Sequence, residues 1–515
     1  MGPRTLLIAS LLFAVFLLAP YGALPERRVP QNGALPLTPG ATTDQVTGDW
    51  PMFRHDPCHS GSTSEKLIPP LRLVWKYPTR QPIVSSPAVS HGRVYFGSRD
   101  SALHIVHAVT GKPIREHRAK DWIDSSPAVS GGSLYFASRD GYIYSLNPIS
   151  GRLSWKYHTG GTDCSSPVVV NGVLYIASGY PNAHLRALSA SSGQSLRIYE
   201  TTQPVYSSPA VKDGTVYIGS NDGRFYALKS EERKTDVPTP SFELKWAFET
   251  GGGIYFSSPA IPDSLIYCIP GDYDRNAYCL RQSDGSVKWR YQVENQKGSK
   301  REIHSTPPYG GRIEGGLSVL ESPDWAFPFV YVSSPAIAHG MVYFISGYPE
   351  QYLYALHALA GSLVWRHAVG QATGLGFSSS PVVADSVVYA GSGDGTLYAL
   401  NAITGSPLWS YDTQSPILSS PVVATSRLYV GTFRGDLYCF QSSIGETDLA
   451  SGGQSGLRME LLPKAYGLMP ASPNPFTSTI AITFAIPAFS AEASGRPDAA
   501  RRTQDAHAVI LSIYD

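Results

Sequence analysis

The feature that most constrains this chain is a short motif, Ser-Ser-Pro followed by small or β-branched residues, which recurs eight times. Successive copies lie 40, 40, 42, 50, 76, 46 and 40 residues apart. A period of about forty residues is typical of propellers and solenoids, in which each repeat buries its apolar surface against its neighbours. The chain is therefore a repeat protein. The prolines that mark the copies are Pro87, Pro127, Pro167, Pro209, Pro259, Pro335, Pro381 and Pro421.

Each repeat contains four short apolar runs separated by turn residues. In the copy at 379–411 the runs are divided at Asp385, Asp394 and Thr404, each followed by Ser or Gly. Such residues favour tight turns between antiparallel strands, and the runs are rich in Val, Tyr, Leu and Trp. We therefore predict an up-and-down sheet of four strands in each repeat. Eight such sheets packed radially predict an all-β, eight-bladed propeller.

The two ends of the repeat region bear on whether the propeller closes. Residues 71–77 (LRLVWKY) read as a fourth strand without its first three, and the last copy stops after Phe440 without a tryptophan-bearing strand. We therefore predict that the strand of Trp75 completes the final blade and ties the two ends together. An open stack of repeats is the alternative.

Tryptophan marks the fourth strand of most repeats. The first and third repeats read PIREHR and LRIYE at this place, with Ile114 and Tyr199 as the expected replacements. A large aromatic side chain at a repeated position is expected to wedge between blades, with ligand stacking as the alternative. The equivalent tryptophans are Trp75, Trp155, Trp246, Trp289, Trp365 and Trp409.

Composition and the N-terminus limit the class of protein. The formal net charge is only +1, and no basic run exceeds two residues, so nucleic-acid binding is not expected. Residues 1–23 combine Arg4, an apolar run at 6–19 and small residues up to Ala23, the arrangement of a secretory signal peptide. Residues 24–47 read as a linker. No other segment approaches the length of a transmembrane helix, and the first cysteine, Cys58, lies too far along for a lipid anchor.

Five cysteines in an exported chain allow at most two disulfides. Cys268 and Cys279 flank one predicted hairpin and could face each other across it. The alternative is that the cysteines are small buried fillers, because Cys279 and Cys439 occupy the place that alanine takes in other repeats.

Composition changes after residue 441. Residues 442–466 form a Gly/Ser-rich linker, and 467–515 form a second module whose readable part is ASPNPFTSTIAITFAIP, at 471–487, with a last strand VILSIYD.

Two families are similar to parts of this chain. The SSPAV, VYFGS, DGxLYAL and TGxxxW elements resemble the pyrroloquinoline quinone (PQQ)-type propeller repeat over residues 48–441. The segment TGDWPMFRHDPCHSG is similar to the one that often precedes such repeats in secreted bacterial proteins, where it packs as a structural strap. Separately, PNPFTSTIAITFAIP with ILSIYD resembles the start of type IX secretion sorting domains and of the FlgD-like immunoglobulin-type fold. Members of that family continue past this point, so we expect this module to be incomplete.

The PQQ resemblance implies a fold more clearly than a cofactor. Enzymes of that superfamily hold the quinone in the funnel with calcium, acidic and amide ligands, a catalytic aspartate, a stacking tryptophan and often a disulfide of adjacent cysteines. This chain has no adjacent cysteines, and no Glu, Asn and Asp set can be assigned to three of its blades. No cofactor, metal or catalytic residue is therefore expected, and PQQ with calcium belongs only to an enzyme alternative.

Other motifs of catalysis and metal binding are weak. The sequence contains no G-x-S-x-G, phosphate-loop or H-E-x-x-H motif. The stretch GDYDRNA at 271–277 has oxygen ligands at calcium-loop spacing, but it lacks the glycine and the final glutamate and reads better as a hairpin turn. His55, Asp56, Cys58 and His59 could bind zinc, although their spacing matches no standard pattern and they lie in the strap-like segment.

Insertions indicate which face of the propeller carries recognition. Those at 179–184, 271–276, 347–351 and 292–330 fall on one predicted face, and only 229–242 lengthens the other. Loops on a rigid scaffold commonly carry binding sites. The residues just before each motif should ring the channel mouth on the insertion-rich face, where they could hold a peptide or a sugar or simply fill the channel. These candidate rim residues are Asp124, Asp163, Tyr206, Tyr255, Phe256, Tyr331 and Phe377.

The sequence thus favours an exported, non-catalytic propeller that binds a protein or another ligand through its insertion-rich face, as propellers similar to this one do in outer-membrane assembly. The expected location is extracellular, at the cell surface or at the outer membrane, with the periplasm as the alternative. A PQQ- and calcium-dependent quinoprotein oxidoreductase of alcohols or sugars is the second hypothesis. A carbohydrate-binding propeller that uses the aromatic rim is the third.

Overall fold

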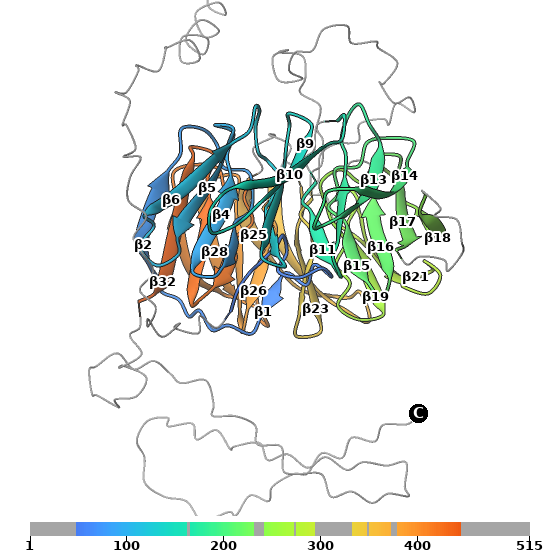
Figure 1. The fold of residues 1–515 in the computed structure, drawn as a ribbon. Helices are drawn as coiled ribbons and strands as arrows, with labels where there is room; N and C mark the ends of the chain where they lie inside the picture. The colour runs from blue at the N-terminus through green and yellow to red at the C-terminus, as the bar shows by residue number, and fades with distance from the viewer. Residues whose placement is uncertain are drawn as a thin grey trace, which may run out of the picture. The chain divides into compact units, whose positions relative to one another are not determined.

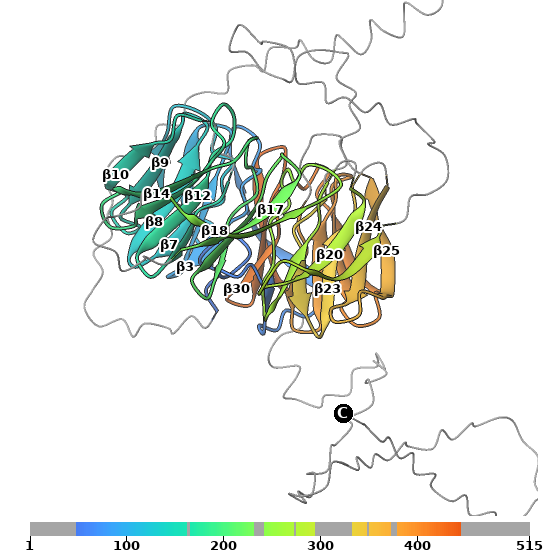
Figure 2. The same cartoon turned by 90° about the vertical axis from the view of Figure 1, so that its right-hand side faces the viewer.

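The computed structural model describes residues 48–161, 165–230, 241–271, 274–293, 332–347, 350–371 and 379–443. All regular elements in these ranges are strands, and they form eight sheets around a central axis, antiparallel apart from one short parallel pairing at residues 62–63 (Figures 1 and 2). This confirms the predicted all-β, eight-bladed propeller. The signal peptide, the first linker, and the predicted C-terminal linker and immunoglobulin-like module from residue 444 on lie outside the described residues.

The first four blades each contain four strands in sequence order. Blade 1 consists of β3 (Ala88–Ser90), β4 (Arg93–Gly97), β5 (Ala102–His107) and β6 (Pro113–Arg118). Blade 2 consists of β7 (Ala128–Ser130), β8 (Ser133–Ser138), β9 (Tyr142–Leu146) and β10 (Leu153–His158). Blade 3 consists of β11 (Val168–Val170), β12 (Val173–Ala177), β13 (His184–Ser189) and β14 (Ser195–Glu200). Blade 4 consists of β15 (Ala210–Lys212), β16 (Thr215–Gly219), β17 (Arg224–Lys229) and β18 (Glu243–Glu249).

Three of the other four blades vary this plan, and in blade 5 the inner strand is reduced to a bridge between Ala260 and Tyr267. Blade 5 consists of β19 (Leu265–Cys268), β20 (Asn276–Arg281) and β21 (Val287–Gln292). Blade 6 consists of β22 (Ala336–Ala338), β23 (Met341–Ile345), β24 (Glu350–His357) and β25 (Leu363–Gln371). Blade 7 consists of β26 (Val382–Ala384), β27 (Val387–Gly391), β28 (Thr396–Asn401) and β29 (Pro407–Asp412), with β1 (Ser62–Thr63) beside β26. Blade 8 consists of β30 (Val422–Ala424), β31 (Arg427–Gly431), β32 (Asp436–Ser442) and β2 (Leu71–Pro78).

Blade 8 closes the propeller with a strand from the beginning of the repeat region. Strand β2 pairs antiparallel with β32, and Trp75 lies opposite Cys439. The predicted closure is confirmed, and the open stack is wrong.

A ring of hydrogen bonds around the axis also closes the propeller, and it explains the Ser-Ser-Pro motif. The N–H of the second serine in each copy donates to the Oγ of its counterpart in the next blade, at 2.9–3.1 Å in all eight steps. The last step runs from Ser420 N to Ser86 Oγ. In five copies the first serine also accepts from a backbone N–H of the second strand, as Ser333 does from Ile345. Because a buried polar group without a partner costs about 1–3 kcal/mol, each copy needs both hydroxyls.

The repeated tryptophans wedge between blades, as predicted. Five of them donate from Nε1 to a carbonyl of the next blade, at 2.7–3.2 Å. At Gly405, whose φ is +70°, a Cβ would lie 2.5 Å from the Trp365 ring, so a glycine is needed beneath the wedge.

The expected replacements for the missing tryptophans are wrong. Register places Arg115 opposite Ile105 in blade 1 and Arg197 opposite Ala187 in blade 3, as Trp289 lies opposite Cys279 in blade 5. Arg197 donates from Nη1 to the Ser230 carbonyl of the next blade and so replaces the indole N–H. Ile114 is exposed, and Tyr199 lies opposite Leu185, two residues farther along the strand.

The cysteine fillers are confirmed and the disulfide is not formed. Cys279 lies opposite Tyr267 while Cys268 lies opposite Tyr278, so the two thiols point to opposite faces of the sheet and into different clusters. Both are free, and burial raises the pKa of Cys279 to about 11. Cys439 fills the equivalent place opposite Tyr429.

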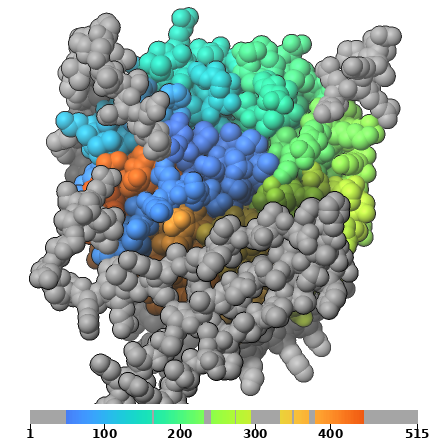
Figure 3. All heavy atoms as spheres, turned by 90° about the horizontal axis from the view of Figure 1, so that it is seen from below, coloured from blue at the N-terminus to red at the C-terminus, as the bar shows by residue number. Residues whose placement is uncertain are grey.

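A strap formed by residues 48–63 crosses the lower face, which carries the turns between the first and second and between the third and fourth strands (Figure 1). The strap hydrogen-bonds to the inner strand region of seven blades. Seen from below, the N-terminal residues, in blue, lie at the centre of this face (Figure 3). Arg54 is buried in the channel and donates to the carbonyls of Pro381 and Pro335, at 2.6 and 2.8 Å. The strap therefore fills the lower mouth of the channel, as the resemblance implied.

Across the part of the chain that the structure describes, no helix has the length and apolar character needed to span a membrane.

Candidate functional site

The upper face, opposite the strap, carries the insertions. Those at 179–184, 271–276 and 347–351 join second to third strands, and the one at 292–330 links blades 5 and 6. The segment at 229–242 joins β17 to β18 on the lower face. The described strand ends that flank these insertions lie on the predicted faces, whereas residues 231–240, 272–273, 294–331 and 348–349 lie outside the described residues. Because the strap occupies the lower mouth, the upper mouth is the better candidate for recognition.

Asp124 is the most constrained of the predicted rim residues. Its side chain is 2% exposed, and its two oxygens accept from Arg99 Nε and Nη2 at 3.0 and 3.2 Å. Arg139 Nη2 adds an ion pair at 2.9 Å. Both guanidinium groups lie over the ring of Trp122, at 4.6 and 5.1 Å from its centroid. The carboxylate therefore braces the junction of blades 1 and 2.

Sequence reasoning missed the arginines and Trp122. The signal was present, because Ser-Arg-Asp follows the second strand in both blade 1 and blade 2, which places Arg99 and Arg139 at the same height. Topology alone brings both turns to the blade link that contains Trp122 and Asp124.

Aromatic side chains form a second part of the mouth. The rings of Tyr206 and Phe256 lie 5.4 Å apart at an interplanar angle of 32°, although 50 residues separate them in sequence. Tyr206 Oη also accepts from the Tyr180 N–H at 3.5 Å. Tyr206, Tyr255 and Phe256 are all half-buried. The structure therefore brings two of the predicted rim aromatics together, whereas Asp163, Tyr331 and Phe377 lie outside the described residues.

Behind the mouth, the turns of the upper face are fixed by pairs of side chains four residues apart. Tyr144, Tyr226 and Tyr278 donate to Asp140, Asp222 and Asp274 at 2.7–2.8 Å. Burial and then the bonded carboxylate raise the pKa of each tyrosine. These phenols therefore stay protonated and serve as donors.

Blade 3 departs from this pattern in a way that changes the local charge. Asn182 and Arg186 stand where blades 1, 2, 4, 5 and 7 have an aspartate and its partner. Arg186 is 7% exposed, and its Nη2 donates to the Thr159 carbonyl at 2.9 Å. Asn182 donates to the same carbonyl. The upper face of blade 3 therefore holds a buried cation instead of an acid.

The two suspected metal segments have structural roles. The Asp274 carboxylate accepts from Gly251 N, Asn276 N and Nδ2, and Tyr278 Oη, which supports the hairpin-turn interpretation of GDYDRNA. In the strap, Asp56 accepts from the N–H groups of Cys58 and Ser60. Within the part of the chain that the structure describes, no three His, Cys, Asp or Glu side chains converge as metal ligands do.

His59 should make stability depend on pH. It is fully buried against the Pro259 carbonyl, 3.1 Å from Nδ1, and desolvation lowers its pKa from 6.5 to about 4. Between these values the unfolded chain binds a proton that the folded chain excludes, so stability falls as pH falls. The expected loss from pH 7 to pH 4 is about 3 kcal/mol, measured by urea unfolding.

The comparison with His59→Gln isolates this effect, because the pKa values of His117, His184 and His367 are also lowered by burial. In the wild type the slope of unfolding free energy against pH should correspond to about one more proton bound on unfolding than in the variant. Equal slopes for the variant and the wild type would contradict the assignment.

A quinone with calcium would need a carboxylate that is free to act as a ligand near a tryptophan of the mouth. Asp124 lies with Trp122 around the same two guanidinium groups, but both of its oxygens already bond to Arg99 and Arg139. This carboxylate is therefore not available as a calcium ligand, and the described part of the mouth does not fit the group.

Known proteins similar to this chain fall into two groups. The family model described as outer membrane protein assembly factor BamB matches residues 72–291 and 349–449. The outer membrane protein assembly factor BamB of Yersinia pestis is 26% identical over 207 residues, 39% of this chain and 42% of that protein. The chain thus spans about two fifths of the length of this curated relative.

Solved structures share the fold at low identity. BamB from Moraxella catarrhalis superposes with a TM-score of 0.55 and 15% identity, covering 72% of this chain and 99% of that chain. Quinohemoprotein alcohol dehydrogenase from Comamonas testosteroni superposes with a TM-score of 0.60 and 15% identity, covering 82% and 83%. At these identities the likeness concerns the fold alone.

Proposed function

This chain belongs to the family described as outer membrane protein assembly factor BamB, and from that membership we propose an exported, non-catalytic scaffold that binds protein partners at the cell envelope. The upper face is the proposed binding surface. We place the protein at the outer membrane or beyond it, with residues 1–23 as its signal peptide and 467–515 as a type IX sorting or FlgD-like segment.

The observation that carries this proposal is the opposite use of the two faces. The lower mouth is filled by the strap, whereas the upper face bears the insertions and the half-buried Tyr206 and Phe256. Tyr180, on one of these insertions, is 64% exposed. Aromatic side chains that keep one face exposed are favoured at protein interfaces.

Site-specific photo-crosslinking in cells tests the proposal. A crosslinking amino acid is placed at Tyr180 or Gln203 on the upper face, and at the exposed Ser191 or Ser283 in lower-face turns as matched controls. We expect discrete protein adducts from the upper positions only. Adducts from the lower positions alone, or from none of the four, would refute the scaffold role of the upper face.

The two other hypotheses have direct tests. Titration of the full chain with PQQ in the presence of calcium should give no binding; affinity in the micromolar range or tighter would replace the scaffold with a quinoprotein oxidoreductase. Glycan retention that is lost in Tyr255→Ala and Phe256→Ala would instead support a carbohydrate-binding propeller.

A further inference from the structure

Among the described residues, nearly all exposed large apolar side chains lie at one edge of the propeller. Of fifteen large apolar side chains that are exposed among the described residues, fourteen lie on the lower rim. We define the apolar rim as these fourteen: they sit in the turns before fourth strands, in the first three residues of those strands, or beside the end of β32. The exception is Tyr180 on the upper face. The rim comprises Ile68, Leu73, Val109, Ile114, Ile149, Leu153, Leu196, Leu244, Val287, Leu359, Leu363, Val364, Ile403 and Leu408.

The turn tips project farthest from the rim. Ile149, Leu359, Ile403 and Val109 are 66, 59, 48 and 47% exposed. The repeated tryptophans pack beside these turns and are themselves largely buried between blades. The apolar side chains at the turn tips remain exposed, so packing against the next blade does not explain why they are apolar. Single exposed apolar residues are common on proteins, but their restriction to one rim of all eight blades is not expected from chance exposure.

The same stretches are basic in a chain that is nearly neutral overall. The hairpin turns before fourth strands and the first three residues of those strands hold nine Lys or Arg and five acids, against 41 and 40 in the whole chain. Two of these cations and three of these acids lie at 231–240, outside the described residues. Among the described acids, Glu243 pairs with Lys229 at 2.7 Å. The described cations are Arg72, Lys112, Arg115, Arg152, Arg197, Lys245 and Lys288.

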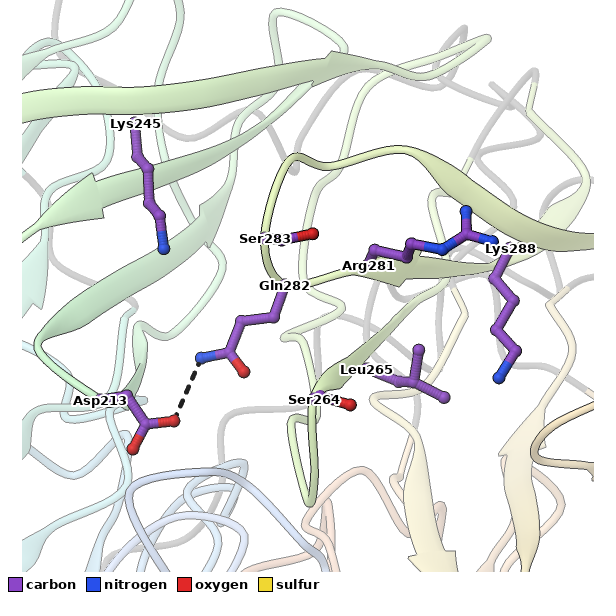
Figure 4. A pocket seen from close by; sticks show the side chains of 8 residues that line it. All are labelled: Asp213, Lys245, Ser264, Leu265, Arg281, Gln282, Ser283 and Lys288. Carbon is purple, nitrogen blue, oxygen red and sulfur yellow. Dashed lines mark hydrogen bonds between the residues drawn. The ribbon is translucent and has the colours of Figure 1, made fainter.

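A hollow at this rim could receive an anionic group. It lies between blades 4 and 5, has a volume of about 580 Å³, and is lined by Lys245, Arg281 and Lys288 (Figure 4). The single acid of its lining, Asp213, lies 3.4 Å from the Gln282 amide, which donates to it.

We infer that the apolar rim docks the lower face onto an anionic lipid surface, with the upper face turned away from it. A protein partner would cover the rim of only a few blades. The apolar rim includes residues of all eight blades, so covering it requires an approximately flat surface wider than the propeller. Apolar side chains with basic neighbours are the combination that binds the interface of anionic bilayers. This inference does not depend on the scaffold function of the upper face.

Vesicle flotation of the full chain tests the inference. Wild-type protein should float with vesicles of phosphatidylglycerol and phosphatidylcholine and less with phosphatidylcholine alone. The triple variant Ile149→Asp, Leu359→Asp, Ile403→Asp should bind at least about tenfold more weakly. Tyr180→Asp, with a comparably exposed side chain on the other face, is the matched control and should bind as wild type does.

A charge variant separates the two contributions. Lys112→Glu with Arg152→Glu should weaken binding to the anionic vesicles only, and raising the salt from about 0.1 M to about 1 M should have the same effect on wild type. All substitutions are at exposed positions, so unchanged melting temperatures will show that the variants fold.

Three outcomes would overturn the inference. They are wild-type protein that floats with neither vesicle, a triple variant that floats as wild type does, and binding of inorganic phosphate without vesicle binding. A dimer in analytical ultracentrifugation that the triple variant abolishes, without flotation of wild type, would assign the rim to self-association. The crosslinks from the upper face are measured in a separate experiment, so their loss or retention does not change the interpretation of the flotation assay.

Discussion

Replacing Trp289 with alanine is expected to lower the free energy of unfolding by about 3–5 kcal/mol. The indole is 9% exposed and packs between blades 5 and 6, with its ring centroid 6.0 Å from that of Tyr267. Its Nε1 donates to the Ala358 carbonyl at 2.7 Å. Gly361 lies directly beneath the ring, where a Cβ would be only 2.5 Å away. Because glycine has no side chain that could move into the space, the alanine variant should leave a cavity.

The measurement is urea unfolding followed by tryptophan fluorescence and by circular dichroism. Trp289→Phe keeps most of the apolar contact but loses the N–H donor, so it should cost clearly less than the alanine variant. Arg115→Ala is the matched control, because Arg115 has the same register position in blade 1 but is exposed. It should change stability by no more than about 0.5 kcal/mol. A loss for Trp289→Ala as small as this would contradict the wedge role.

The contrast between Trp289 and Arg115 shows how far sequence reasoning reached. The forty-residue period, the turn residues and the displaced strand of Trp75 were enough to predict eight closed blades, because these features are local and repeated. The replacements for tryptophan were predicted wrongly, although the spacing was available. Gly111 and Gly193 lie four residues before Arg115 and Arg197, as Gly285 lies four residues before Trp289. The prediction assumed an apolar side chain at this place, whereas an arginine can pack its alkyl part and donate from its guanidinium group, as Arg197 does to the Ser230 carbonyl.

The serine ring and the upper mouth show a second limit of prediction from the sequence. Each bond of the ring joins copies at least 40 residues apart, and the eighth joins Ser420 to Ser86. The motif predicted an important position, but its partner was visible only once the blades were closed. In the same way topology predicted that Asp124 lies at the upper mouth, whereas its bonds to Arg99 and Arg139 depend on side-chain reach.

Asp124→Ala is the second substitution with a large expected effect, a loss of about 3 kcal/mol in the free energy of unfolding. It removes the carboxylate from between Arg99, whose side chain is 10% exposed, and Arg139, at 26%. The cost arises because two poorly hydrated guanidinium groups are left with one fewer counter-charge. Arg224→Ala breaks an ion pair of similar length, 2.9 Å, in which both side chains are well exposed to solvent, so it should lower the free energy of unfolding far less than Asp124→Ala does.

Asp124→Asn distinguishes a structural role of Asp124 as a brace from a direct role in ligand binding. The amide keeps the size and one acceptor of the carboxylate but not its charge. If the carboxylate is a brace, unfolding in urea should show a loss between those of wild type and Asp124→Ala, and crosslinks from Tyr180 should persist. If Asp124 instead binds a partner directly, Asp124→Asn should retain wild-type stability and lose the crosslinks. The bonds from both arginines favour the first result, since a carboxylate with both oxygens engaged has little capacity left for a ligand.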